Sequence, residues 1–436
     1  MNPLASELNQ IIQDHSPNLF RLLSVFGREI YFPKGILSQA QEAKEKAELF
    51  NATLGTATEN DDPMYLPSIQ HYINDLSPND VYPYAPAAGK PELRDRWAQK
   101  LNEDNPSLAQ KVISRPIVTC GITHGLALMA DLFVNPDDTI ILPHMFWGNY
   151  RLIYELRYGA NISTFPFFDS SGGFNLQAFK ELLSEKGKEN QKMIIILNLP
   201  NNPTGYTVTP EEAEEIKTIV YNQAEKGNDI IIASDDAYFK LFYENSIKES
   251  LFAHFTGLHK NILAIKLDGA TKEEYVWGFR VSFITFGLGD QDKAALVYPA
   301  IEKKVMGAIR AMVSNAPHLS QTLVLKALNS PDFQMEAKSK FDILKSRALK
   351  VKEVLDNPKY ASAWEVYPFN SGYFMCLKIK NVDAEELRLH LLNRYAIGVI
   401  SASSTDIRIA FSCVEVEDVQ KLFDFIYQAV NDLTGG

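Results

Sequence analysis

Short runs of β-branched and apolar residues alternate with polar, helix-compatible stretches through the middle of the chain. Runs of this length and composition predict buried strands, and the stretches between them predict helices. Such alternation is typical of an α/β fold, in which helices cover both faces of a mostly parallel sheet. Seven runs predict a seven-stranded sheet: residues 116–120, 139–142, 162–165, 193–198, 230–234, 262–267 and 280–286.

One of the intervening helices can be placed from its own residues. Thr209 supplies an N-cap, Pro210 suits the first turn, and Glu211 and Glu212 place negative charge at the positive end of the helix dipole. The pattern predicts a helix that continues to about Lys226.

The pattern changes at about residue 319. Long helical stretches such as 332–355 follow, then two strand candidates at 371–379 and 406–411, and a helix from about Val416. These elements predict a smaller α+β domain. Residues before 63 have little sheet character, and we expect an arm that packs onto the smaller domain or onto a partner subunit. The expected division is an N-terminal arm with part of the small domain (1–62), a large domain (63–318) and a C-terminal small domain (319–436).

Composition narrows the classes of function. At 436 residues the chain is long enough for two or three domains of roughly 100 to 200 residues each. A net charge of -11 without any Lys/Arg-rich block argues against nucleic acid or an anionic membrane as the main partner. The N-terminus lacks a basic region followed by an apolar stretch, and no segment reaches the roughly 18 apolar residues of a membrane span. We therefore expect a cytoplasmic protein.

The cysteines offer no metal or disulfide chemistry. Cys120, Cys376 and Cys413 are widely spaced and form no CxxC pair. Neither a disulfide framework nor a zinc site is indicated, and we expect packing residues and no metal.

Polar residues follow three successive predicted strands. In open α/β sheets, ligands bind outside the carboxyl ends of the strands. The fourth run is followed by Asn-Asn-Pro-Thr-Gly at 201–205, and the fifth by Asp-Asp-Ala-Tyr at 235–238. The sixth leads into Asp-Gly-Ala-Thr-Lys at 268–272, and Arg280 lies eight residues beyond that lysine.

These strings, in this order and after successive strands, resemble the fold type I aminotransferases, the aspartate aminotransferase superfamily. Each string alone is weak, but further matches in the correct order cover most of the chain: Leu-Gly at 54–55, Tyr-Ala-Pro-Ala-Ala-Gly at 84–89, Phe-Trp-Gly-Asn at 146–149, Arg310, and Arg-Ile-Ala at 408–410. The resemblance implies a large domain that binds pyridoxal 5'-phosphate (PLP), and a homodimer with shared active sites.

The resemblance makes Lys272 the residue that forms a Schiff base with PLP. An amine is a nucleophile only when deprotonated, and a position after a buried strand near Arg280 lowers a lysine pKa. The competing interpretation is that Lys272 is an ordinary surface lysine. The matches of Arg280 and Asp235 to the family pattern favour the catalytic interpretation. Asp235 would pair with the pyridinium nitrogen and keep it protonated, so that the ring can absorb carbanion electrons. Asp236 points to the opposite side of an extended chain and is expected to be structural.

Three further residues match groups that surround the cofactor in the family. Tyr238 and Asn202 resemble the residues that hydrogen-bond its phenolic oxygen, although either could be an ordinary turn or core residue. Trp147 matches the residue that stacks on the pyridine ring, whereas an isolated Trp is more often a core residue. The Asn-Pro bond of this loop is cis in the family, so we expect a cis bond between Asn202 and Pro203.

The resemblance places the phosphate where Gly121, Ile122 and Thr123 open a helix, because free N–H groups and the helix dipole favour an anion there. Arg280 adds a charged fork, and Tyr84 is expected to reach in from the other subunit.

One departure from the family concerns the phosphate. Relatives often carry a serine three residues before the lysine, where this chain has Gly269. The hydroxyl of Thr271 could bind the phosphate instead, in a phosphate site that holds its ligand less tightly than usual.

Arg408 resembles the arginine that holds the substrate α-carboxylate, with Gly55 and Asn202 beside it. A structural ion pair is the competing interpretation. Arg310 matches the arginine with which family members that act on aspartate and glutamate read the distal carboxylate, donated across the dimer interface.

A dinucleotide site is not indicated. Gly287-Leu288-Gly289 begins like a dinucleotide fingerprint, but the expected third glycine is Asp292, and Asp290 would repel a pyrophosphate.

Three functions are consistent with the resemblance. The first is an aminotransferase that moves an amino group between an L-amino acid, with aspartate, glutamate or an aromatic donor favoured, and a 2-oxo acid. Lys272 would then move a proton between Cα and the cofactor. The second is a PLP-dependent β-lyase or decarboxylase on the same scaffold. The third is a PLP-dependent regulator, which usually carries a DNA-binding module, and no basic helix-turn-helix segment precedes the matching region.

Overall fold

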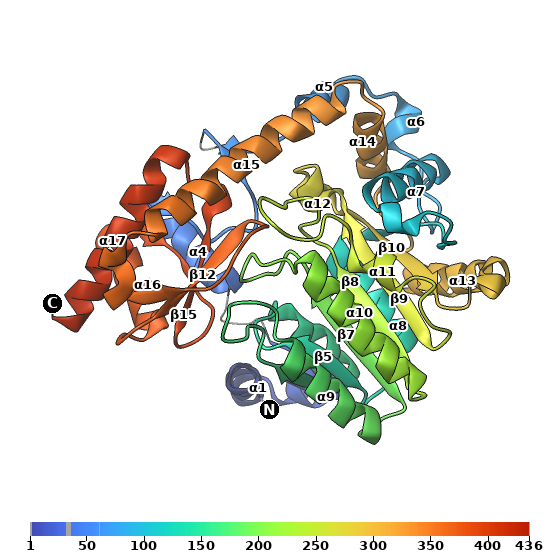
Figure 1. Cartoon of the computed structure of the whole chain (residues 1–436), viewed down its shortest axis with the longest axis horizontal. Helices are drawn as coiled ribbons and strands as arrows, with labels where there is room; N and C mark the ends of the chain where they lie inside the picture. The colour runs from blue at the N-terminus through green and yellow to red at the C-terminus, as the bar shows by residue number, and fades with distance from the viewer. Residues whose placement is uncertain (1, 32–35, 61, 436) are drawn as a thin grey trace.

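The computed structural model describes residues 2–31, 36–60 and 62–435. A seven-stranded sheet and a four-stranded sheet, each covered by helices, form the frame of the molecule (Figure 1). No helix in the described part of the chain is long and apolar enough to cross a membrane.

The large sheet contains the seven strands predicted for the middle of the chain, in the order β4-β10-β9-β8-β7-β5-β6. Strand β10 runs antiparallel to both of its neighbours, and the pairs from β9 to β6 are parallel. The predicted mostly parallel, seven-stranded α/β sheet is therefore confirmed. The strands are β4 Ile117–Cys120, β5 Thr139–Pro143, β6 Asn161–Phe165, β7 Lys192–Asn198, β8 Asp229–Asp235, β9 Ile262–Gly269 and β10 Val281–Leu288.

The central strands are apolar along their whole length because both faces of the sheet are buried. Successive side chains alternate between two cores: Ile194 and Ile231 belong to one, whereas Ile195 and Ile232 belong to the other. The first core lies under α7 Pro91–Asp104, α8 Ile122–Phe133 and α13 Ala294–Met312, and the second under α9 Leu176–Glu189, α10 Pro210–Glu225 and α11 Leu251–Phe255.

Helix α10 begins where its residues predict. The Thr209 hydroxyl accepts a hydrogen bond from the Glu212 N–H at 3.2 Å, and the Glu212 carboxylate accepts one from the Thr209 N–H at 2.8 Å. This capping box pairs backbone N–H groups that the first helical turn leaves free. It fixes the end of the loop that carries Asn202.

The C-terminal part of the chain forms the smaller α+β unit that the sequence predicts. Its sheet has the order β11-β12-β15-β14, and all its pairs are antiparallel. Its elements are β11 Trp364–Val366, β12 Phe374–Ile379, β14 Ile400–Ser401 and β15 Asp406–Ala410, with α15 Phe333–Leu355, α16 Ala384–Tyr395 and α17 Val419–Thr434.

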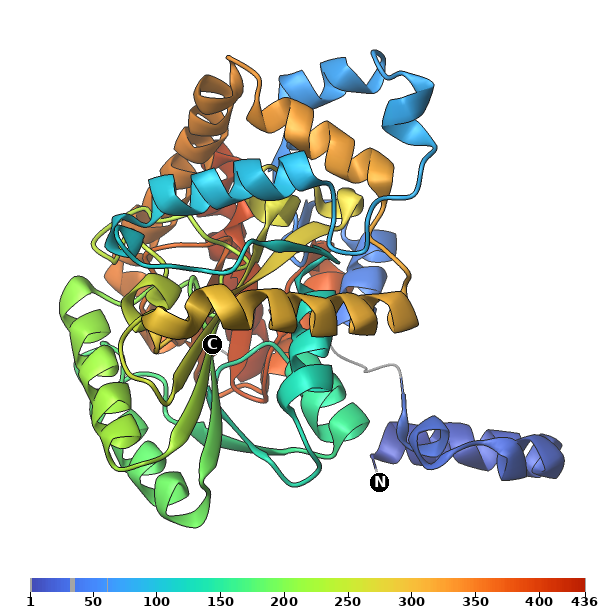
Figure 2. The ribbon, with the colours of Figure 1, turned by 90° about the vertical axis from the view of Figure 1, so that its right-hand side faces the viewer.

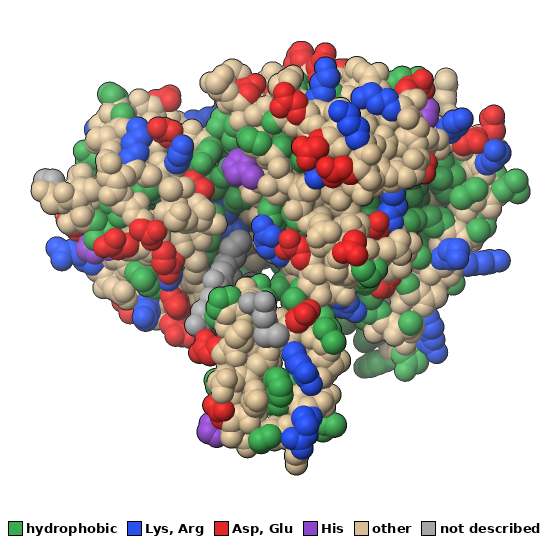
Figure 3. Space-filling view, turned by 90° about the horizontal axis from the view of Figure 1, so that it is seen from below, with side chains coloured by type: hydrophobic (Ala, Val, Ile, Leu, Met, Phe, Trp, Pro, Cys, Tyr) green, Lys and Arg blue, Asp and Glu red, His purple; other side chains and the backbone are tan. Residues whose placement is uncertain are grey.

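The N-terminal residues divide between two places. Helix α4 Ile36–Lys46 and strand β1 Phe50–Asn51 pack on the small unit, because β1 pairs in parallel with β13 Ile397–Gly398. Helices α1 Pro3–His15, α2 Pro17–Leu22 and α3 Val25–Glu29 form a separate lobe that stands off the body (Figure 2). Figure 3 shows this lobe from below, with basic and acidic side chains interspersed over that face of the molecule.

The remaining elements are the helix α14, which packs against α5, α6 and α7, and shorter pieces that connect the main elements. They are β2 Thr58–Glu59, β3 Asp62–Pro63, α5 Pro67–Ile73, α6 Pro78–Val81, α12 Ala270–Glu273, α14 His318–Leu328, the π-helix η2 Arg151–Arg157, and the 3-10 turns η1 Pro106–Leu108, η3 Trp277–Phe279, η4 Gln291–Lys293, η5 Pro358–Ser362, η6 Phe411–Cys413 and η7 Val416–Asp418.

Candidate active site

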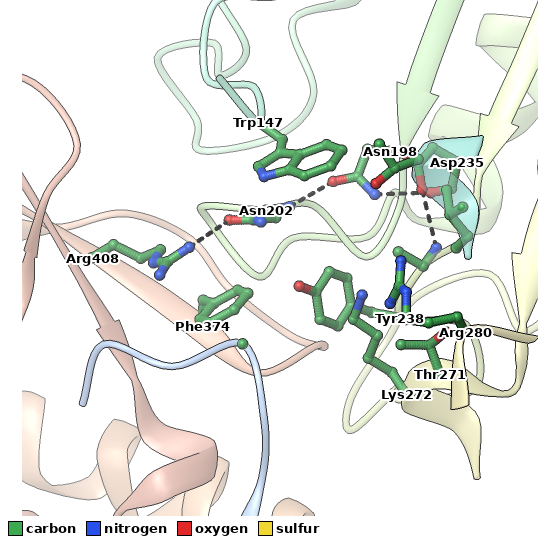
Figure 4. Close-up of a pocket in the computed structure, with 14 residues that line it drawn as sticks. Trp147, Asn198, Asn202, Asp235, Tyr238, Thr271, Lys272, Arg280, Phe374 and Arg408 are labelled. Carbon is green, nitrogen blue, oxygen red and sulfur yellow. Dashed lines mark hydrogen bonds between the residues drawn. The ribbon is translucent and has the colours of Figure 1, made fainter. Parts of the chain in front are cut away.

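A cavity of about 260 Å³ lies at the carboxyl end of the large sheet, where β12 and β15 of the small unit face it (Figure 4). Strand ends, a helix start and the small unit all contribute to its wall. The structure brings most of the predicted site residues together there: Gly55, Ile122, Thr123, Trp147, Asn202, Asp235, Tyr238, Lys272, Arg280 and Arg408.

Lys272 lies on α12, the single helical turn that follows β9, and its side chain faces the cavity. Burial lowers its pKa to about 8; Asp235 opposes this effect and Arg280 adds to it. Its Nζ atom lies 5.1 Å from the centre of the Tyr238 ring. A substantial fraction of such a lysine is neutral, and hence nucleophilic, near neutral pH.

Asp235 is the last residue of β8, and only 2% of its surface is exposed. Burial raises its pKa to about 6, and Asp236 adds to this, whereas Tyr150 and Lys272 oppose it. Its Oδ1 atom accepts a hydrogen bond from the Ala237 N–H at 3.2 Å. The cavity therefore holds a lysine and a carboxylate whose pKa values have moved toward each other. Asp236 points away, as predicted, and pairs with the buried Lys266.

Sequence reasoning missed Tyr150. Its hydroxyl donates a hydrogen bond to Asp235 Oδ2 at 2.5 Å. Tyr150 directly precedes the π-helix η2, three residues after Trp147. Insertions of π-helix are frequent at functional sites, but an aromatic residue in an apolar stretch gives no sequence signal for that role.

Asn198, Ala237, Thr271 and Phe374 also line the cavity. Of these, only Thr271 was singled out in the sequence. Asn198 ends β7, directly opposite Asp235 in the strand register. Its Nδ2 donates to the Asp235 carbonyl at 2.8 Å, and its Oδ1 accepts from the Asn202 N–H at 2.7 Å. Asn198 thereby joins the loop that carries Asn202 to the end of β8.

Arg408 lies on β15, and 2% of its surface is exposed. Its Nη1 donates to Asn202 Oδ1 at 3.0 Å and its Nη2 to the Thr53 carbonyl at 2.8 Å, while its Nε is buried without a partner. The guanidinium carbon lies 4.2 Å from the centre of the Phe374 ring. Both hydrogen-bond acceptors are formally neutral, so the buried positive charge is oriented but not neutralised by them.

The start of α8 and Arg280 form a cradle for an anion. The N–H groups at the start of a helix are free, and the dipole favours negative charge there. Gly121 caps α8 with φ +80°, and a Cβ atom at this position would lie 2.0 Å from Arg280 Nη2. Only glycine allows the arginine to approach the backbone this closely. Ile122 and Thr123 continue the cradle into the cavity.

The structure explains Gly269. A Cβ atom here would lie 2.4 Å from the Cα of Ser282 on the neighbouring β10, so the strand leaves no room for a serine. Thr271 lines the cavity next to Lys272, and its hydroxyl lies 3.4 Å from that of Ser282.

The prediction of a cis bond between Asn202 and Pro203 is wrong. The cis peptide in the described chain joins Leu199 to Pro200, three residues earlier in the same loop. Each X-Pro bond has only a small intrinsic trans preference, so a sequence with two prolines in one loop does not show which bond is cis.

Besides Gly121, which caps α8, two predicted site residues do not line the cavity of the single chain. Tyr84 is 91% exposed, and Arg310 is exposed near the end of α13. Both were expected to act on the other subunit, so their roles stay predictions.

Comparisons with known proteins agree with this geometry. A crystal structure of an aminotransferase from Anaerococcus prevotii has a TM-score of 0.82 at 24% sequence identity, over 92% of this chain and 97% of that chain. The Pyrococcus horikoshii kynurenine aminotransferase, solved in complex with PMP, has a TM-score of 0.78 at 15% identity, over 95% and 98%. These likenesses show that the fold is that of the fold type I aminotransferases, as predicted.

Sequence relatives identify the family. The profile of the family described as aminotransferase class I and II matches residues 58–426. The probable aspartate/prephenate aminotransferase of Aquifex aeolicus is 30% identical over 302 residues, which is 66% of this chain and 69% of that protein. The chain belongs to the class I and II aminotransferases and is an enzyme of transamination. The alternatives of a β-lyase, a decarboxylase or a regulator are not favoured.

Proposed function

We propose that this aminotransferase binds PLP covalently at Lys272 and moves an amino group between an L-amino acid and a 2-oxo acid. One observation carries the proposal: a lysine of lowered pKa, a buried carboxylate and an anion cradle line the same cavity. These groups fit the aldehyde, the pyridine nitrogen and the phosphate of PLP. When bound, PLP supplies an electron-accepting ring that stabilises negative charge at the substrate Cα.

The phosphate end would be held by Arg280, Thr271 and the backbone N–H groups of Ile122 and Thr123. The close approach of Arg280 to Gly121 supports this assignment, because it places the charged guanidinium group beside the free N–H groups at the start of α8. Tyr84 is proposed to come from the second subunit of a homodimer.

The ring would lie between Trp147 and the end of β8, with Tyr238 and Asn202 beside its oxygen. Asp235 would pair with the ring nitrogen. In its charged form Asp235 favours a protonated nitrogen, and the Tyr150 hydrogen bond stabilises that charged form.

Arg408 would bind the substrate α-carboxylate, with Gly55 opposite. The guanidinium is buried and its Nη atoms already point at fixed acceptors. A carboxylate would add the negative charge that these acceptors lack, and its two oxygens match the planar fork of an arginine.

Lys272 would carry the proton. Its neutral amine would accept the proton from the substrate Cα as general base, and the resulting ammonium would donate a proton as general acid. A pKa of about 8 suits both steps near neutral pH, because neither form of the amine is rare.

We further propose aspartate or glutamate as one amino donor, with aromatic donors also accepted. The Aquifex aeolicus relative bears the name of an aspartate/prephenate aminotransferase. The cations of the cavity, Lys272, Arg280 and Arg408, already have assigned partners. A distal carboxylate therefore needs another cation, and Arg310 of the second subunit is the proposed one.

An amino-donor screen with 2-oxoglutarate as acceptor tests this function. We expect aspartate, or an aromatic donor, to yield glutamate and the matching 2-oxo acid in equal amounts. Release of ammonia without glutamate would overturn the proposal in favour of a lyase.

A further inference from the structure

Lys100 lies behind the turn that carries Lys272, on helix α7 and outside the cavity. Its ammonium group forms an ion pair with Glu273, another with Asp104 at 3.0 Å, and lies 4.0 Å from Glu274 Oε1. The side chains of Lys100, Glu273 and Glu274 are 6%, 2% and 2% exposed. Three carboxyl groups thus surround one buried ammonium, and burial raises the pKa of Glu274 to about 8, so that Glu274 is mostly neutral at pH 7.

The Glu273 carboxylate depends on Lys100 for compensation of its charge, and Glu274 lies within reach of the same ammonium. Glu273 Oε1 and Glu274 Oε2 are buried without a hydrogen-bond partner. Lys240, the other lysine of this cluster, pairs with Asp104 at 2.6 Å from a half-exposed position and forms no ion pair with either glutamate. Without Lys100, two adjacent carboxyl groups would face each other in a dry environment, which is strongly unfavourable.

The same helix also holds the chain just before Lys272. Trp97 lies three residues from Lys100, on the same face of α7. Its indole N–H donates to the Asp268 carboxylate at 3.2 Å, and its ring stacks on Phe283 at 4.2 Å. Lys100 Nζ lies 4.7 Å from the centre of the Trp97 ring. Helix α7 therefore anchors both the end of β9 and the residues after Lys272.

The turn also has contacts outside this cluster: the Tyr373 hydroxyl donates to the Lys272 carbonyl at 3.3 Å, and the Thr271 hydroxyl lies 3.4 Å from that of Ser282. Helix α12 comprises only Ala270–Glu273, and the Glu274 N–H closes it with a 3.0 Å hydrogen bond to the Ala270 carbonyl. A helix this short is not stable by itself. The direction of the Lys272 side chain is thus set by the contacts on either side of it.

We propose that Lys100 is a positioning residue of the active site: by pairing with Glu273 and Glu274, it fixes the turn that holds Lys272 in place opposite Asp235. The inference rests on the proposed attachment of PLP to Lys272. Lys100 would not touch cofactor or substrate.

A positioning role and a purely structural role predict different results for Lys100→Met. Misplacement of Lys272 slows proton transfer and changes the surroundings of the bound cofactor, but leaves Arg408 and the substrate carboxylate unaffected. A structural role lowers the melting temperature alone. The discriminating readouts are the split between kcat and KM, and the pH at which the absorbance of the bound cofactor changes.

The experiment compares the PLP-loaded wild type with Lys100→Met and with Lys240→Met, which removes the half-exposed ion pair to Asp104 and leaves the ion pairs of Lys100 in place. For Lys100→Met we expect kcat to fall about tenfold or more, with KM for the donor changed less than about twofold, and the absorbance midpoint to shift by at least about half a pH unit. Lys240→Met should keep kcat within about twofold and show no shift. A Lys100→Met enzyme with a lower melting temperature but unchanged kcat and midpoint would overturn the inference.

A second variant covers the case in which Lys100→Met does not fold. Glu273→Gln keeps the size of the side chain, removes one charge from an acid-rich cluster and breaks the closest pair of Lys100. We expect it to shift the absorbance midpoint and to lower kcat in the same pattern, and wild-type values for both would overturn the inference. Failure of the wild type to be labelled at Lys272 by borohydride would instead reject the proposed function itself.

Discussion

The Tyr150 hydroxyl lies 2.5 Å from Asp235 Oδ2 and donates a hydrogen bond to it. Tyr150 is 1% exposed, so water does not compete for this bond. Burial favours the neutral carboxyl, whereas a donor favours the carboxylate, and the balance gives Asp235 a pKa of about 6. Asp235 is therefore mostly charged at pH 7, but its pKa lies only about one unit below that pH.

Removing the Tyr150 hydroxyl should shift this balance. In Tyr150→Phe, the Asp235 pKa rises further above its usual range, so the carboxylate is lost at a higher pH. Because activity needs the charged carboxylate, we expect the acidic limb of the kcat profile to move to higher pH, and kcat at pH 7 to fall about tenfold. Tyr154→Phe, which loses only a 3.4 Å bond to the Leu126 carbonyl, is the matched control. An unchanged acidic limb in Tyr150→Phe would contradict this role.

The lowered pKa of Lys272 predicts how cofactor attachment depends on pH. Attachment needs the neutral amine, whose fraction rises with pH and reaches one half at about pH 8, compared with 10.5 for an ordinary lysine. The rate at which PLP binds covalently to the apoenzyme should therefore rise as the pH passes through 8. This rate can be measured from the change in absorbance of the cofactor. Since the folded chain holds this proton less tightly than the unfolded chain, the contribution of Lys272 to stability should increase from pH 8 to pH 10.5. An attachment midpoint near pH 10 would show that Lys272 is not perturbed.

Gly269→Ser should weaken the enzyme, although the family resemblance led us to expect a serine at this position. The added Cβ meets the Ser282 backbone at 2.4 Å, so β9 and β10 must separate. We expect a loss of about 1 to 3 kcal/mol in unfolding free energy, the cost of overpacking, and weaker retention of PLP. Gly307→Ser is the control, because nothing lies within 4 Å of a Cβ at that position. A melting temperature as high as that of the control would exclude the steric explanation.

We expect Arg310 to decide the substrate class. Its replacement by leucine should reduce kcat/KM for aspartate and glutamate by roughly two orders of magnitude, as expected for a lost charge-assisted contact of about 3 kcal/mol. Turnover of alanine or phenylalanine should change little. Lys304→Leu, which removes another exposed cation of α13, controls for the change in surface charge. Equal losses for both substrate classes would make Arg310 an interface residue without a role in recognition.

The sheet and the helix α10 were predictable because their own residues indicate whether each position is buried and where the helix begins. Strands β7 and β8 are buried on both faces and are apolar throughout, and Thr209 and Glu212 cap their helix with their own side chains. The motif residues follow the strand ends directly, so the sequence order alone placed Asn202, Asp235 and Lys272 at one edge of the sheet.

The missed residues depend on information that the sequence does not contain. Asn198 reaches Asp235 only through the register of β7 against β8. Tyr150 reaches Asp235 from the segment that leads into the π-helix η2. Phe374 enters the cavity because the small unit docks against the sheet edge. Strand register, the path of the chain between distant segments and the docking of the small unit are tertiary properties, so local patterns did not reveal these contacts.

The most direct test is to reduce the PLP-loaded enzyme with borohydride and to locate the fixed label by peptide mass spectrometry. We predict a single labelled peptide with the cofactor on Lys272, and no label in Lys272→Ala, which should also be inactive. The buried Lys266, six residues earlier on β9, is an internal control because its ion pair with Asp236 holds it away from the cavity. A label on Lys266 or any other lysine, or a label retained by Lys272→Ala, would contradict the assignment of Lys272 as the residue that carries the cofactor.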